Sequence, residues 1–72
     1  MKMNEIIDLI ERAVGSGYSI KHASDRGSVS VFMAEAKEDD VIPSAIAIAV
    51  DTNTYKIGTS IISIDEAIKN AK

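Results

Sequence analysis

The stretch Ser44–Asp51, SAIAIAVD, alternates isoleucine or valine with alanine. Successive side chains of a β-strand point to opposite faces of a sheet, so this alternation predicts a strand with one large apolar face and one small face. Alanine is depleted in strands, and a strand face in solvent usually carries polar residues. Two interpretations of the small face follow: alanine is simply tolerated there, or another surface packs closely against it.

One helix is predicted before the first strand and another after the last strand. Apolar residues recur at three- and four-residue spacing over residues 3–14, which is typical of an amphipathic helix. Near the other end, Ser63 and Glu66 form a capping box that predicts a helix start, with Ile62 and Ala67 at the positions of a hydrophobic staple. Alternating segments predict three further strands, at residues 18–22, 28–36 and 55–60.

These elements predict a single α+β domain over residues 1–72, in the order α-β-β-β-β-α. We expect an antiparallel four-stranded sheet made of two hairpins, with both helices on one face. The face under the helices is expected to carry Val29, Val31, Met33, Ile46, Ile48, Val50, Tyr55 and Ile57. The opposite, small face is expected to carry Phe32, Ala34, Ala36, Ala45, Ala47, Ala49, Lys56 and Gly58.

Composition and charge exclude several classes of protein. The chain has no cysteine, which excludes disulfides and thiolate zinc sites. A net charge of −3 disfavours general binding to phosphates, so nucleic acid is not the expected partner. Acidic residues interrupt the apolar pattern of the first helix, and no apolar run reaches about 18 residues, so neither a signal peptide nor a membrane span is expected. We expect a cytoplasmic protein, or one in the host cytoplasm if a phage encodes it.

No pattern of residues predicts catalysis, a metal site or a cofactor. The lone histidine, His22, would need a nucleophile or an orienting carboxylate to act as a base. Asp25 lies three residues away, but this spacing is not diagnostic of a catalytic triad. The acidic residues between positions 35 and 40 lack the ligand pattern of a calcium loop. We therefore expect a non-enzymatic protein.

Two surfaces are candidates for contact with a partner. The acidic residues between positions 35 and 40 would favour a protein with a basic surface, because charge complementarity steers association. The small face would meet a protein or a second copy of the chain, because contiguous exposed apolar patches often mark interfaces. The predicted partner-binding residues are Glu35, Glu38, Asp39, Asp40, Phe32, Ala47 and Ala49.

The segment Met3–Lys21, MNEIIDLIERAVGSGYSIK, resembles small acidic phage anti-CRISPR proteins that inhibit Cas nucleases: a short Asn-led helix precedes a Tyr-led strand. The resemblance implies binding to a basic groove of a nuclease and blocking of its DNA, with Glu35, Glu38, Asp39 and Asp40 as contacts. The element order also resembles a double-stranded-RNA-binding domain, whose last helix begins with phosphate-binding lysines. The segment 63–66 stands at those positions without a lysine, so RNA binding does not carry over.

We therefore expect a small acidic protein-interaction module, and, if the resemblance holds, a phage-type inhibitor of a nucleic-acid-processing protein. Two alternatives stay open. A nucleic-acid-binding domain would use Lys21, Arg26, Lys37 and Lys56 on the sheet, and its affinity would fall steeply with salt. A homodimeric structural or regulatory subunit would stack the alanine faces of two copies.

Overall fold

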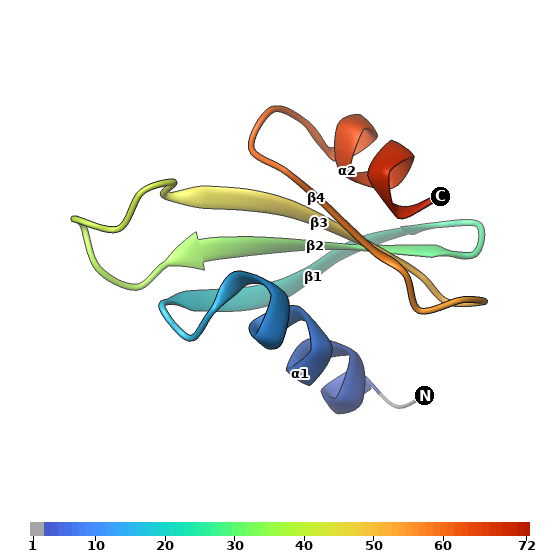
Figure 1. Cartoon of the computed structure of the whole chain (residues 1–72), viewed down its shortest axis with the longest axis horizontal. Helices are drawn as coiled ribbons and strands as arrows, with labels where there is room; N and C mark the ends of the chain where they lie inside the picture. The colour runs from blue at the N-terminus through green and yellow to red at the C-terminus, as the bar shows by residue number, and fades with distance from the viewer. Residues whose placement is uncertain (1–2) are drawn as a thin grey trace.

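Two helices and one four-stranded sheet make up residues 3–72, the part of the chain that the computed structural model describes. The strands form an open antiparallel sheet in the order β1-β2-β3-β4, so neighbours in the sheet are also neighbours in the chain (Figure 1). This confirms the predicted α+β class and the order α-β-β-β-β-α. The elements are α1 (Met3–Val14), β1 (Tyr18–Arg26), β2 (Val29–Ala36), β3 (Ala45–Asp51), β4 (Ile57–Ser60) and α2 (Ile64–Ala71).

The strand boundaries differ from the prediction at both ends of the sheet. β1 continues to Arg26, and a two-residue turn at Gly27 and Ser28 leads into β2. Gly27 has a φ of 62°, a backbone conformation that glycine adopts without steric cost. A bulge at residues 22–24 shifts the β1–β2 register and bends β1. Tyr55 was expected to begin the fourth strand and to face the core. Instead it has a φ of 59° and lies in the turn before β4.

The two helices cover opposite faces of the sheet, which corrects the expectation that both lie on one face (Figure 1). We call the face beneath α1 the α1 face. Ile6 and Ile10 of α1 pack there against Phe32, Ile48 and Val50. This side holds most of the large buried side chains, so it forms the main apolar core.

The opposite face, which we call the α2 face, is built mainly from small side chains. Ala67 and Ala71 of α2 pack there against Val29, Ala47 and Ala49. A Cβ added to Gly58 in β4 would collide with the backbone of α2 at Ala67, Asn70 and Ala71. The chain's own second helix therefore packs on Ala47 and Ala49 of β3, whereas Ala45 stays exposed.

The β2–β3 pairing register explains why the prediction placed the wrong residues of β2 on the same face as the large residues of β3. Phe32 lies opposite Ile48, and Val31 lies opposite Ala49. The large side chains of β3 therefore share a face with the even-numbered residues of β2, because directly paired residues point to the same side of a sheet. Each strand's alternation was identified correctly, but β2 was matched to β3 one residue out of register, which exchanges the faces of a strand. The members of β2 on the α1 face are Phe32, Ala34 and Ala36, and those on the α2 face are Val29, Val31 and Met33.

Neither helix within residues 3–72 combines the length and the apolar character needed to cross a membrane.

Candidate interaction surface

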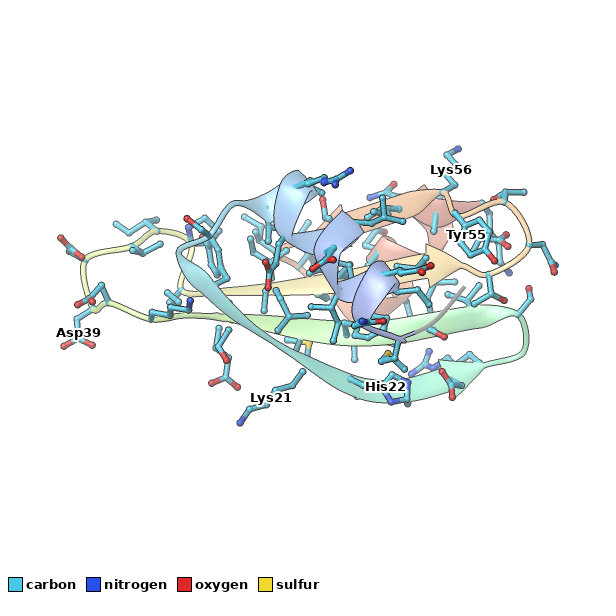
Figure 2. All side chains as sticks on the ribbon, turned by 90° about the horizontal axis from the view of Figure 1, so that it is seen from below. Lys21, His22, Asp39, Tyr55 and Lys56 are labelled. Carbon is cyan, nitrogen blue, oxygen red and sulfur yellow. The ribbon has the colours of Figure 1, made fainter. Side chains whose placement is uncertain are left out.

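The acidic residues predicted to bind a partner are all exposed, and they gather at one end of the sheet. Three of them, Glu38, Asp39 and Asp40, lie in the loop 37–44 between β2 and β3, which we call the acidic loop. Asp39 lies at the far end of this loop, well beyond the strands (Figure 2). Glu35 precedes the loop on β2 and pairs with Ala45 of β3.

Three hydrogen bonds fix the base of the acidic loop to the folded domain, one of them from the amide of Lys37 to the carbonyl oxygen of Gly17 over 2.9 Å. The amide of Ala36 donates to the carbonyl oxygen of Ser44 over 2.8 Å, which closes the loop where it leaves the sheet. The hydroxyl of Tyr18 donates to the carbonyl oxygen of Pro43 over 2.7 Å. The loop is therefore anchored on both sides, while its charged side chains face solvent.

Phe32 and Ala49 are buried in the two cores and cannot contact a partner in this fold, which corrects their assignment to an exposed face. Both are 0% exposed: Phe32 lies beneath α1, and Ala49 lies beneath α2. Ala47 is also buried, but its side chain lines a hollow that α2 leaves open on the α2 face. Of the three apolar residues predicted for the interface, Ala47 alone borders an open surface.

This hollow, which we call the isoleucine hollow, has a volume of about 190 Å³. It lies where β3 and β4 meet the start of α2, on the side of the sheet toward the acidic loop. Its most exposed members are Ile61 and Ile62, at 72% and 82% exposed. The lining residues are Met33, Ala45, Ala47, Ser60, Ile61, Ile62, Ser63 and Ile64.

The connection between β4 and α2 is held by side-chain hydrogen bonds that leave both isoleucines outside. The Ser60 hydroxyl oxygen accepts from the amides of Ile62, over 3.0 Å, and Ser63, over 3.4 Å. The Ser63 hydroxyl oxygen accepts from the amide of Glu66 over 3.1 Å, which confirms the predicted N-cap. The predicted staple is wrong, because Ile62 turns to solvent while Ala67 packs against the sheet.

Sequence reasoning missed Ile61 and Ile62 as surface residues, although a signal was present. The two isoleucines are adjacent between the end of a strand and an N-cap serine. Adjacent side chains of an extended segment point in opposite directions, so both cannot enter the same core. One exposed isoleucine was therefore foreseeable; the exposure of both depends on the turn that Ser60 imposes.

Charges of both signs lie beside the isoleucine hollow, and the excess negative charge at this end of the sheet comes from the acidic loop. Glu35 is the cross-strand neighbour of Ala45, a lining residue, and Lys21 of β1 is the neighbour of Met33. Asp65, next to Ile64, lies 2.8 Å from the guanidinium of Arg26 in an exposed ion pair.

The basic residues of the alternative nucleic-acid-binding surface do not gather into one patch. Lys21 lies on β1 and Lys56 lies just before β4, at opposite edges of the sheet (Figure 2). Arg26 is paired with Asp65, and the ammonium group of Lys56 donates to the carbonyl oxygen of Lys72 over 3.1 Å.

His22 takes part in a small polar cluster at the exposed margin of the α1 face. Its Nε2 lies 2.9 Å from Oδ1 of Asp25, and its ring centroid lies 5.2 Å from that of Phe32. Hydrogen bonds from His22 and then from Ser30 lower the pKa of Asp25 below its ordinary value. Within residues 3–72, no group of three or more His, Cys, Asp or Glu side chains is arranged to hold a metal ion. Of this cluster, the His22 ring packs at a tilt against the Phe32 ring.

No family model, curated protein or solved structure matches the chain. The resemblance to anti-CRISPR proteins therefore stays a prediction, and the functional proposal below depends on the geometry of the surface.

Proposed function

We propose that the chain is a non-enzymatic protein-interaction module that binds a protein with a basic surface. One observation carries this proposal: the isoleucine hollow reaches Ala45, the first residue of β3, which directly follows the end of the acidic loop at Ser44. An apolar centre with a polar, solvent-accessible rim is the usual anatomy of a protein–protein interface. Exposed apolar patches rimmed by polar residues mark such sites on small proteins.

Charge supports a basic partner rather than an acidic one. Glu35 borders the hollow, and the acidic loop begins directly beyond the pair that Glu35 forms with Ala45. The chain as a whole carries a net charge of −3. A partner with a positive patch would be attracted and oriented by these carboxylates, since complementary fields raise association rates and fix register.

The hydrogen bonds around Ser60 and Ser63 favour binding because they order the β4–α2 connection in the free protein. Ordering of loops and side chains on association costs free energy, and a surface that is ordered beforehand avoids part of that cost. The two exposed isoleucines are thus presented on a backbone that is already fixed.

The homodimer with stacked alanine faces does not fit this fold, because α2 covers Ala49 and most of Ala47. Self-association through the isoleucine hollow is a separate possibility that light scattering measures directly.

The experiment is a quantitative pull-down from the source organism with the full chain and two variants. One variant carries Glu38→Lys and Asp39→Lys; the other carries Ile61→Ser and Ile62→Ser. We expect the same protein to be retained by the native chain and lost by both variants, with near-native circular dichroism in each.

The matched control carries Asp8→Lys and Glu11→Lys on exposed positions of α1, which changes the net charge as much as the loop variant does. Retention should survive this change. Equal loss with the control would reduce the effect to overall charge, and retention by all variants would contradict the proposal.

The anti-CRISPR resemblance would make the partner a Cas nuclease whose DNA groove the acidic end occupies. A DNA-cleavage assay with a purified Cas9 and excess chain tests this narrower statement. Inhibition that the loop variant abolishes would support it. Unchanged cleavage would remove that nuclease as the partner and leave the protein-binding proposal in place.

A further inference from the structure

We propose that the isoleucine hollow is an anchor pocket for one aromatic side chain, presented by a basic segment of the partner protein. This inference rests on the proposed function and specifies its central contact. The size of the hollow, the chemistry of its lining and the charge beside it each point to this occupant.

The volume of the isoleucine hollow suits one ring. The hollow measures about 190 Å³. An engineered apolar protein cavity of about 150 Å³ holds a benzene molecule, whereas pockets for cofactors and drug-sized ligands measure roughly 300–1,000 Å³. A single large side chain fills this space.

The lining is apolar and partly adaptable. Ala47 is buried at its base and Ala45 lies exposed at its rim, and their small side chains are what leaves the space open. Met33, Ile61 and Ile62 line it as well. A methionine thioether makes favourable contacts with aromatic rings and adjusts to their shape, which favours an aromatic occupant over a small aliphatic one.

The serine oxygens at the edge of the hollow already accept hydrogen bonds from backbone amides, from Ile62 and Ser63 at Ser60 and from Glu66 at Ser63. A ring that enters therefore leaves the main polar atoms of the edge satisfied. Aromatic residues are enriched among the few side chains that dominate interface energies, and they commonly fill such pockets.

The partner segment is assigned as basic because Glu35 and the acidic loop leave a net negative charge at this end of the sheet, with Lys21 on the neighbouring strand beside Met33. Glu35 stands beside Ala45, and the carboxylates of the acidic loop follow within a few residues. Lysine or arginine side chains flanking the anchoring ring would meet these groups.

A titration followed by ¹H–¹⁵N NMR tests the inference with two synthetic peptides. One is Gly-Lys-Lys-Phe-Lys-Lys-Gly, and the other has alanine in place of phenylalanine. We expect the phenylalanine peptide to shift the amide signals of residues 45–47 and 60–64, and to bind about tenfold or more tightly than the alanine peptide. Both peptides should shift residues 37–44 through charge.

A variant that fills the hollow separates anchoring from charge. Ala45 is exposed at the rim, so Ala45→Leu should occupy the hollow without disturbing the core. We expect this variant to bind the two peptides equally. The matched control is Ala13→Leu at an exposed position of α1, which should keep the preference for phenylalanine.

Equal binding of both peptides by the native chain, with shifts confined to residues 37–44, would overturn the anchor pocket and leave the basic-partner proposal standing. A preserved preference in a folded Ala45→Leu variant would overturn it too. Absence of any shift with either peptide at millimolar concentration would count against both the anchor and the basic partner.

Discussion

The two faces of the sheet hold their helices in different ways. On the α1 face, large side chains such as Phe32 and Ile48 fill the space between strand and helix. On the α2 face, Gly58 and Ala49 are so small that the helix backbone lies directly against β4. The first face is stabilised mainly by apolar area removed from water, and the second by close contact of many atoms. The alternation in β3 thus serves two helices at once, one through large residues and one through small residues.

The comparison predicts that truncating a buried side chain lowers the free energy of unfolding most on the α1 face. Phe32→Ala should lower the free energy of unfolding by about 3–5 kcal/mol, because the ring is fully buried and its loss leaves a cavity. A domain of this length has roughly 4–11 kcal/mol of stability in total, so the variant should unfold at much lower urea concentration. Phe32→Leu, which keeps most of the volume, should cost less. Little loss of stability in either variant would mean that Phe32 is not central to this core.

On the α2 face, enlargement rather than truncation should be damaging. Gly58→Ala should lower the free energy of unfolding by about 1–3 kcal/mol, because the new methyl group collides with the backbone of α2. The matched control is Gly17→Ala, where an added Cβ has nothing within 4 Å. Its effect should stay within about 0.5 kcal/mol in the same urea titration. A Gly58→Ala variant as stable as the control would show that α2 does not lie closely on β4.

A smaller effect is expected at the polar margin of the α1 face. Because His22 and Ser30 hold the pKa of Asp25 low in the folded chain, the ionised carboxylate adds stability above the unfolded pKa of about 3.9. This contribution is lost as the pH falls through the lower, folded pKa. The difference in thermal midpoint between the native chain and Asp25→Asn should therefore shrink between about pH 6 and about pH 3. A difference that does not change with pH would contradict the stabilising role of the ionised Asp25 carboxylate.

The predictable part of the fold is the part that local chemistry determines. Hydrophobic periodicity gave α1, alternation gave the four strands, and the hydroxyl of Ser63 marks the start of α2 as expected. These features depend on residues close together in the chain. They needed no knowledge of what lies across the sheet.

The face of the sheet that each helix covers was not predictable in the same way. Alternation in β2 shows which residues share a face, but whether Phe32 or Val31 joins Ile48 depends on the turn between β2 and β3. That turn is the acidic loop, whose length and composition do not fix a register. Because of this register error, the prediction placed Ala47 and Ala49 on a face without a helix and missed their contact with α2.

The candidate site was only partly predictable for a related reason. Charged residues can be identified directly from a sequence, and they usually lie at the surface. Glu35 and the carboxylates of the acidic loop were predicted in this way, and they are exposed. Exposure of apolar residues is decided by tertiary packing: it buried Phe32 and Ala49 and left Ile61 and Ile62 outside. The isoleucine hollow exists because α2 begins beyond Ser63 and leaves Ala45 and its surroundings uncovered.

The neighbour-to-neighbour strand order also has a consequence for how the chain folds. Each ladder joins segments that are adjacent in sequence, and the β1–β2 hairpin closes across two residues. Short loops lose little entropy on closing, so such a topology reaches its native pairing quickly. The second helix is different, because the surface on which it packs includes residues of β2, β3 and β4. We expect α2, an eight-residue helix, to pack last, after the antiparallel sheet has formed.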